Sequence, residues 1–232
     1  MMKLGIIGAM DEEIEIIKNE MEIDSEDIKA QTIFYSGKFQ GKNIILVRCG
    51  IGKVNAAIIA QILISEYKVD TIINTGVAGG VKEDIEIGDV VVSDDVLEHD
   101  FDARSFGYKL GEIPRLNISK FKSDNKLVEL AINSTEMELA DHKVYKGRIV
   151  SGDVFVASPE KKKFLWDEFN AYCVEMEGAA IGHTCYINEI SFVIIRAISD
   201  KADGSADNNF NEFVIDASNK SVNILKRILC RL

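Results

Sequence analysis

The chain has 232 residues, of which 47% are hydrophobic and 28% are charged, a composition typical of a globular protein rather than a disordered one. With 27 Lys and Arg against 38 Asp and Glu, the formal net charge is −11, so we expect no nucleic-acid partner and no anionic membrane partner. No apolar stretch reaches the ~20 residues of a membrane-spanning helix, and no signal peptide is recognisable.

Cysteine and histidine usage adds a second constraint. The cysteines lie singly in apolar segments, like small core residues in a reducing compartment, so we expect a cytoplasmic protein; they are Cys49, Cys173, Cys185 and Cys230. The three histidines lack the spacing of metal ligands, and we expect neither a metal nor an organic cofactor. The basic run at 161–163 is interpreted as the solvated face of a helix.

Apolar runs alternate with amphipathic segments from the start of the chain. Residues 3–8 predict a buried strand, and residues 11–21 predict a helix with an acidic first turn. Residues 31–50 predict a hairpin that turns at Gln40 and Gly41. A helix is expected at 53–67 and a buried strand at 71–75.

The second half continues this alternation. Strands are expected at 88–93, 145–150, 172–176 and 192–198. Helices are expected from Ser123 or Asp124 to about residue 137, from Ser158 with Pro159 at its first position, at 178–186, and from 211 to the end. The whole pattern predicts one α/β domain over residues 1–232, with a mixed or mostly parallel central sheet flanked by helices.

Ligands of such sheets bind beyond the carboxyl ends of the strands, so polar residues there are candidate site residues. Three acids at 11–13 follow the first strand; the helix dipole accounts for two of them, and the third is free to face a cleft. The glycine-rich stretch 74–80 predicts a loop whose backbone lies close to a ligand, because no helix follows it as a phosphate-binding fingerprint requires.

Two later strands also end in polar groups. Glu175 and Glu177 flank Met176, and Arg196 lies inside an apolar strand that ends in Asp200. A carboxylate in such a place is costly to bury without partners, which favours a polar site. The structural alternative is a buried ion pair with a helix cap.

These motifs together resemble the nucleoside phosphorylase/nucleosidase superfamily and, within it, the 5′-methylthioadenosine/S-adenosylhomocysteine nucleosidase family. The resemblance covers essentially the whole chain and lies in the segments 5–10 with Glu13, 36–37, 49–54, 74–80, 87–91, 99–100, 106–108, 151–155, 174–177 and 196–200. It implies a nucleoside phosphorylase-like fold. It also implies hydrolysis of 5′-methylthioadenosine and S-adenosylhomocysteine, and of 5′-deoxyadenosine, to adenine and a 5-substituted ribose, as in methionine salvage and the removal of methyl-cycle by-products.

The same resemblance implies roles for individual residues. Glu13 would be the general base that activates water, and Asp200 the general acid toward N7 of adenine. Glu177 would hold the ribose hydroxyls, assisted by the Met176 backbone. Further substrate contacts are implied for Gly79 near the ribose and water, Phe155 stacked on adenine, Val156 at its Watson–Crick edge, and Glu175 with Arg196 around the water.

Two further sets of residues are assigned a role by the resemblance alone. An apolar wall for the 5′ substituent is implied at Met10, Ile51 and Phe210. A segment that reaches the partner's site in a homodimer is implied at Ala103, Phe106, Tyr108 and Pro114. One departure from the family pattern is Val77, where many members carry a serine whose hydroxyl could help to hold the water.

Four alternatives to this function are considered. A purine nucleoside phosphorylase needs cations around phosphate, whereas Glu13 would repel that anion. Futalosine-type nucleosides stay possible substrates, because the base-side residues would look alike. A dinucleotide-binding module would need a GxGxxG turn opening a helix with an acid further on, which the sequence meets poorly. A non-catalytic nucleoside-binding module would have no need for carboxylates on both sides of its ligand.

Overall fold

A computed structural model describes residues 2–136, 142–204 and 206–232. Its strands are β1 (Lys3–Gly8), β2 (Glu22–Lys29), β3 (Thr32–Phe39), β4 (Lys42–Arg48), β5 (Thr71–Gly80), β6 (Val90–Glu98), β7 (Phe121–Lys122), β8 (Val144–Ser151), β9 (Ala171–Glu175) and β10 (Ser191–Asp200). Its helices are α1 (Asp11–Glu20), α2 (Lys53–Ser65), the 3-10 turn η1 (Arg104–Phe106), α3 (Asn125–Glu136), α4 (Pro159–Phe169), α5 (Gly178–Ile187) and α6 (Ala206–Arg231).

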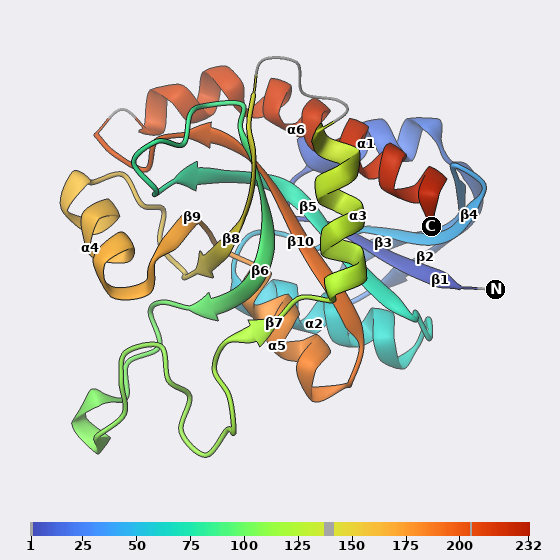
Figure 1. Ribbon diagram of the computed structural model, residues 1–232. Coiled ribbons are helices and arrows are strands. Elements are labelled where there is room, and N and C mark those ends of the chain that lie inside the picture. Colours follow the sequence, from blue (N-terminus) through green and yellow to red (C-terminus); the bar gives the residue numbers. More distant parts are fainter. Residues whose placement is uncertain (1, 137–141, 205) are drawn as a thin grey trace.

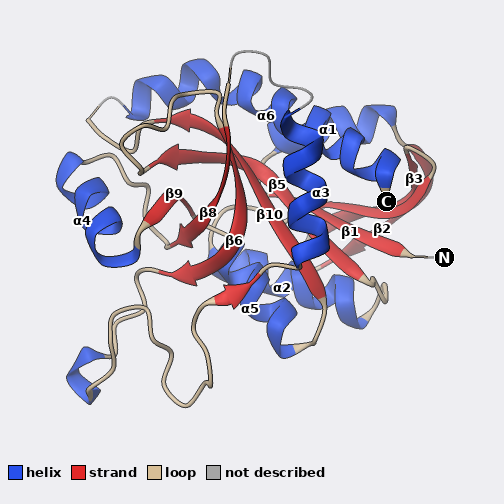
Figure 2. Ribbon diagram, viewed as in Figure 1, coloured by secondary structure: helices blue, strands red, loops and turns tan. Residues whose placement is uncertain are grey.

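All the strands belong to one mixed sheet with the order β10-β6-β8-β9-β5-β1-β4-β3-β2 and with β7 beside β6. Because β10 also pairs with β5, five of the strands close into a ring, β5-β10-β6-β8-β9, from which β1, β4, β3 and β2 extend. Strand β1 lies parallel to both β4 and β5, and β10 lies parallel to β5. The carboxyl ends of β1, β5 and β10 therefore meet at one edge, and Figure 2 shows the sheet running through the centre of the molecule.

Helices cover both faces of this sheet, which explains why its central strands are continuous apolar runs. Helices α1, α3 and α6 pack together on one side, and α2 packs with α5 on the other (Figure 1). Successive residues of a strand face opposite sides, so Ile6 joins the first layer while Ile7 joins the second. The predicted fold class, an α/β protein with a mixed central sheet flanked by helices, is confirmed.

Local signals in the sequence explain several boundaries. The β3–β4 hairpin turns at Gln40 and Gly41, both with positive φ (49° and 73°), as a tight two-residue turn requires. The Ser158 side chain accepts a hydrogen bond from the Lys161 backbone at 3.1 Å and so caps α4 as predicted. Of the two caps proposed for α3, Asp124 is the one that binds the helix, through the backbone N–H of Lys126 at 2.9 Å.

Some predictions are wrong. Residues 74–80 are part of the buried strand β5 and not a loop, because β1, β9 and β10 all pair with β5. Strands β2 and β7 were not predicted, since β2 is an exposed, acidic edge strand and β7 has two residues. Lys162 is not simply solvated: it is half-buried, and its Nζ donates to the Lys201 carbonyl at 2.7 Å. Cys230 is exposed rather than in the core.

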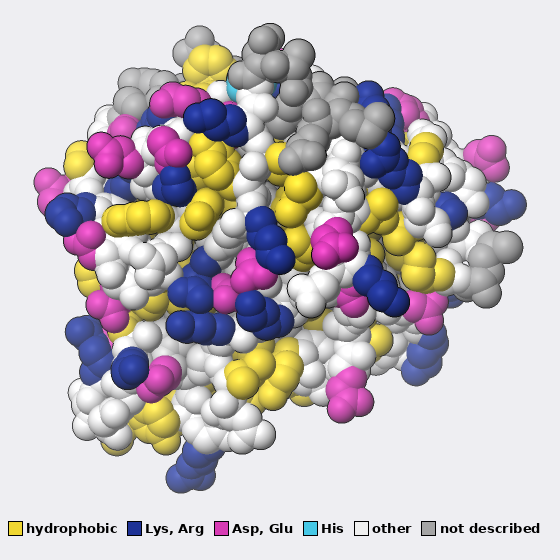
Figure 3. Space-filling model, viewed as in Figure 1, with side chains coloured by type: hydrophobic (Ala, Val, Ile, Leu, Met, Phe, Trp, Pro, Cys, Tyr) yellow, Lys and Arg dark blue, Asp and Glu magenta, His cyan; other side chains and the backbone are white. Residues whose placement is uncertain are grey.

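The surface carries mixed charge. On the face seen in Figure 3, lysine and arginine side chains lie among acidic ones and between hydrophobic patches. Within the ranges described above, no helix is long and apolar enough to cross a membrane.

Candidate active site

A cavity with about 510 Å³ of space free of protein atoms opens at the carboxyl ends of β1, β5, β9 and β10. Its position is the one expected for a ligand site in such a sheet. Its lining is mostly apolar but includes four acidic residues: Ala9, Met10, Glu13, Ile51, Val77, Ala78, Gly79, Phe155, Val174, Glu175, Met176, Glu177, Ser199 and Asp200. The four acids are Glu13, Glu175, Glu177 and Asp200.

Glu13 lies in the first turn of α1 and points back to β1 and β5. Its Oε2 accepts from the Ala9 and Met10 backbone N–H groups at 2.5 and 3.1 Å, and its Oε1 accepts from the Val77 N–H at 3.1 Å. A Cβ at Gly76 would lie within 2.3 Å of Oε1, so this position in β5 requires glycine. Burial raises the pKa of Glu13, and Arg196 and the backbone donors oppose that rise.

Asp200 ends strand β10 on the other side of the cavity. The Ser199 hydroxyl donates to its Oδ2 at 2.9 Å, and the Ala202 backbone N–H donates to its Oδ1 at 2.8 Å. The strand carrying Gly79 runs alongside, and a Cβ at Gly79 would lie 2.8 Å from Asp200 Oδ1. Burial raises the pKa of Asp200 above its ordinary value, and the hydrogen bonds from Ala202 and Ser199 oppose that rise.

Glu175 is the last residue of β9 and Glu177 lies two positions further on, but the two acids have different partners. Glu175 Oε2 pairs with Arg196 Nη2 at 2.5 Å, and its Oε1 accepts from the Ser151 hydroxyl. Glu177 Oε1 accepts a hydrogen bond from the Gly52 backbone at 2.9 Å. Burial and the charge of Glu175 raise the pKa of Glu177 to about 8. Glu175 thus forms an ion pair with Arg196, whereas Glu177 has no cation in direct contact among the residues that the structure describes.

Arg196 lies behind the cavity and not in its lining. It is only 2% exposed, and its Nη2 donates to both Glu175 and Asn74 Oδ1, the latter at 2.5 Å. Burial opposes its charge, but the nearby carboxylates Glu175, Glu13 and Glu177 raise the pKa of Arg196 overall. The Arg196 guanidinium therefore links Glu175 on β9 to Asn74 on β5 behind the cavity.

The other candidates divide into two groups. Met10, Ile51 and Phe155 line the cavity together with Gly79 and Met176. Val156 lines a smaller adjoining hollow that shares Phe155 and Asp200 with the cavity. Ile51 and Phe155 are 53% and 46% exposed, so the apolar wall is open to solvent on their side.

The implied partner-site segment lies elsewhere. It follows β6 and projects from the rest of the molecule, at the lower left of Figure 1, and none of its candidates lines the cavity of this chain. Phe106 is 82% exposed, Tyr108 and Pro114 are half-buried, and Ala103 is buried. Phe210 lies in α6, but its side chain is outside the described residues.

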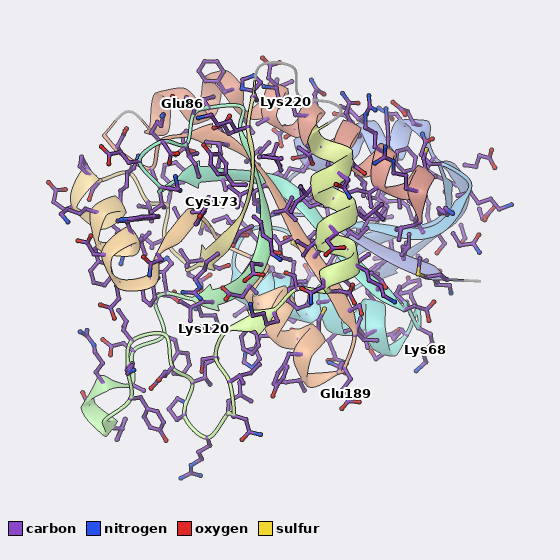
Figure 4. The ribbon with its side chains drawn as sticks, viewed as in Figure 1. Lys68, Glu86, Lys120, Cys173, Glu189 and Lys220 are labelled. Atoms are coloured by element: carbon purple, nitrogen blue, oxygen red, sulfur yellow. The ribbon has the colours of Figure 1, made fainter. Side chains whose placement is uncertain are left out.

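Sequence reasoning missed several residues of the site. Asn74 and Ser151 had been quoted only as parts of motifs, yet they bind Arg196 and Glu175. A polar residue inside an apolar strand has to find a partner, which was an available signal for Asn74. Ala9, Ala78 and Val174 line the cavity, and nothing in the sequence separates them from ordinary core residues. Cys173, labelled in Figure 4, lies beside them on β9 opposite Gly80 and is buried.

The arrangement can perform acid–base chemistry on an uncharged, largely apolar ligand. Glu13 reaches the cavity from helix α1 and Asp200 from the end of strand β10, and burial raises the pKa of each above its ordinary value. Such a pair can take a proton from one atom of a ligand and give a proton to another.

Known proteins resemble this chain over its whole length. The family model described as "Phosphorylase superfamily" matches residues 3–232. The 5′-methylthioadenosine/S-adenosylhomocysteine nucleosidase of Staphylococcus aureus is 42% identical over 230 residues, which is 99% of this chain and 100% of that relative.

Solved structures agree with the sequence relatives. The 5′-methylthioadenosine/S-adenosylhomocysteine nucleosidase from Neisseria meningitidis, in complex with methylthio-immucillin-A, has a TM-score of 0.95 and 39% identity, covering 100% of both chains. The futalosine hydrolase of Helicobacter pylori strain 26695 has a TM-score of 0.93 and 34% identity, covering 100% of this chain and 98% of that one. The chain therefore belongs to the phosphorylase superfamily and, within it, to the 5′-methylthioadenosine/S-adenosylhomocysteine nucleosidase family.

Proposed function

We propose that this chain is an N-glycosyl hydrolase that cleaves 5′-methylthioadenosine, S-adenosylhomocysteine and 5′-deoxyadenosine into adenine and a 5-substituted ribose. The observation that carries the proposal is the pair of buried carboxyl groups, Glu13 and Asp200, in one mostly apolar cavity of a chain from this family. The reaction serves methionine salvage and the removal of methyl-cycle by-products.

The chemistry assigns each carboxyl group a task. Breaking the bond puts positive charge on the ribosyl ring and negative charge on the purine. Asp200 donates its proton to N7 of adenine, which makes the base a better leaving group. Glu13 accepts a proton from the attacking water on the other side of the ring, as the base of an inverting glycosidase does.

The remaining residues bind and orient. Glu177 holds the ribose hydroxyls and stabilises the developing ring charge, with the Met176 backbone beside it. Phe155 stacks on adenine, the Val156 backbone reads its Watson–Crick edge, and Gly79 lets the β5 backbone approach the ribose. Arg196, through its ion pair with Glu175, fixes the water side of the cavity. Met10, Ile51 and Phe210 form the wall for the 5′ substituent.

Water is favoured over phosphate as the nucleophile. An anion near α1 would need free backbone donors or a cation. The N–H groups of Ala9, Met10 and Val77 are already bound by the Glu13 carboxylate. Among the cavity-lining residues described above there is no lysine or arginine. Val77 brings no hydroxyl to the water, which leaves that role to Glu13 and the backbone.

A second candidate activity is hydrolysis of futalosine-type nucleosides. The likeness to a futalosine hydrolase structure at 34% identity favours it. The substrates of the two activities differ in the substituent beyond the ribose, which would lie on the open side of the cavity near Ile51.

We propose further that the enzyme is a homodimer, in which the segment from Ala103 to Pro114 covers the partner's cavity. The exposure of Phe106 and of the Ile51 wall supports this arrangement. We also propose a single domain over residues 1–232, in keeping with the one continuous sheet, and a cytoplasmic location, in keeping with the three buried free cysteines.

The test is a comparison of substrates with the purified protein. Base release is measured for 5′-methylthioadenosine, S-adenosylhomocysteine, 5′-deoxyadenosine and futalosine at equal concentrations. We expect adenine from the first three, with a larger kcat/KM than that for futalosine. A larger value for futalosine would replace the proposal by the second candidate, and release from none would refute both.

A further inference from the structure

Two loops border the cavity on its open side. One joins β4 to α2 and contains Ile51 and Gly52, and the other follows β8 and contains Asp153 and Phe155. Gly52 has a φ of +99°, and a Cβ there would lie 3.2 Å from Asp153 Oδ1. The two loops therefore touch where the substrate would enter between them.

A closed ring of three residues ties these loops together. The Lys53 backbone N–H donates to Asp153 Oδ1 at 2.9 Å, and the Asp153 backbone N–H donates to Asp100 Oδ2 at 3.0 Å. The ring is completed by Lys53 Nζ, which donates to Asp100 Oδ1 at 2.6 Å. Asp153 is thus fixed through both its side chain and its backbone, only two residues before Phe155.

Lys53 comes directly after Gly52, whose backbone N–H donates to Glu177. Helix α2 has no side-chain cap, and its leading N–H groups, those of Gly52 and Lys53, donate to Glu177 and Asp153. Both carboxylates lie at the positive end of the helix dipole, which stabilises them. A shift of the first turn of α2 would therefore move Glu177 and the Phe155 loop together.

The charge of Lys53 keeps the ring closed. Its side chain is 16% exposed, and its Nζ lies 3.3 Å from Glu98 Oε2 as well as near Asp100. Glu98 also contacts the His183 ring through Oε1. Without the ammonium group, Glu98, Asp100 and Asp153 would stand as neighbouring acids with like charges.

We propose that Lys53 is a positioning residue, which sets the Gly52 amide against Glu177 and the Asp153–Phe155 loop against the purine by clamping Asp100. The inference rests on the proposed function, since it treats the cavity as the site that binds the nucleoside. Lys53 itself does not line the cavity, so its effect on the reaction passes through Glu177 and Phe155.

The experiment compares steady-state kinetics of wild type, Lys53→Met and Lys53→Arg with 5′-methylthioadenosine. The clamp acts on Glu177 and Phe155, which bind substrate, and Glu177 also faces the developing ring charge. Lys53→Met is therefore expected to raise KM about tenfold and to lower kcat by a smaller factor, about threefold. Lys53→Arg keeps the charge and is expected to recover most of the KM. The matched control is Lys122→Met, which breaks a surface pair with Asp94 (2.8 Å) outside the cavity and should leave KM unchanged.

Asp100→Asn provides a second route: Lys53 Nζ and the Asp153 N–H donate to different oxygens of Asp100, and in asparagine one of these positions is an NH2 group that cannot accept. It should also raise KM, and the double variant should be no worse than Lys53→Met alone. If Lys53→Met does not fold, the KM of Asp100→Asn tests the proposal in its place.

Unchanged KM in the folded variants, or an increase that Lys122→Met reproduces, would overturn the inference. Wild-type protein that releases no adenine would contradict the proposed function instead. Amide exchange without substrate then decides the clamp: the peptides holding Gly52 and Asp153 should exchange faster in Lys53→Met, and equal rates would overturn it.

Discussion

Glu13, Asp200 and Glu177 share one cavity, but their partners differ. Within the described part of the chain, Glu13 accepts from three backbone N–H groups, Asp200 accepts from a hydroxyl and a backbone N–H, and Glu177 accepts from one backbone N–H. These partners can hold a charged or a neutral carboxyl group, with the burial of each site favouring the neutral form. The residues are therefore suited to exchange protons rather than to form permanent ion pairs.

The first prediction concerns the acid and the base. Asp200→Asn keeps the shape but has no acidic proton, so kcat should fall by on the order of 10²–10⁴. Glu13→Gln should cause a similar fall with little change in KM, because the base acts on water. The measurement is kcat and KM for each variant beside its Tm. A well-folded Asp200→Asn enzyme with near-normal kcat would refute the assignment.

A second prediction concerns pH and Glu177. In the folded chain its pKa is raised from 4.5 to about 8, so the folded state prefers the protonated form. The stability that this preference contributes is fully present below pH 4.5 and is lost as the pH rises through about 8. Glu177→Gln lacks this titration, so its Tm should fall less than that of wild type across this range. Parallel Tm curves would show that Glu177 titrates normally.

At the scale of elements, β5 places the glycines that let two side chains approach the sheet. The third prediction is that Gly76→Ala lowers kcat about 100-fold, since displacing a catalytic group by about 1 Å has that effect. The new Cβ would lie 2.3 Å from Glu13 Oε1. Because β5 pairs with both β1 and β10, the strand cannot easily shift to relieve this contact. Gly204→Ala, which meets nothing within 4 Å, is the control. Equal kcat for the two variants would contradict this account of β5.

Periodicity predicted the central elements but not the edges. The strands beginning at Lys3 and Thr71 are apolar because both of their faces are buried, and that signal is strong. Strand β2 forms by pairing with β3 alone and has no buried face to leave a pattern. The stretch 74–80 looked like a loop because glycine usually breaks strands, whereas here neighbouring carboxylates require it.

The sequence predicted some residues of the candidate site but not the contacts between them. Strand-end acids such as Glu175 and Asp200 were visible as polar groups after apolar runs. The partner of Arg196 on β5 was not, because the bond between Arg196 and Asn74 joins residues 122 positions apart. Roles such as base and acid came from the resemblance, since local sequence cannot tell which acid faces a cavity.

At the scale of the whole molecule, one chain leaves the Ile51 side of its cavity open. The fourth prediction is a homodimer, with Phe106→Ala weakening the dimer and raising KM for 5′-methylthioadenosine. The reason is that an aromatic ring 82% exposed in the single chain becomes buried across an interface. Sedimentation beside activity is the measurement, and a stable, fully active monomer would contradict it.

The central claim is that water attacks the nucleoside, with Glu13 as its base. The most direct measurement is turnover of 5′-methylthioadenosine in phosphate-free buffer and again with added phosphate, with the sugar product identified by mass. We predict equal rates and free 5-methylthioribose in both. A rate that requires phosphate, with 5-methylthioribose 1-phosphate as the product, would contradict the account.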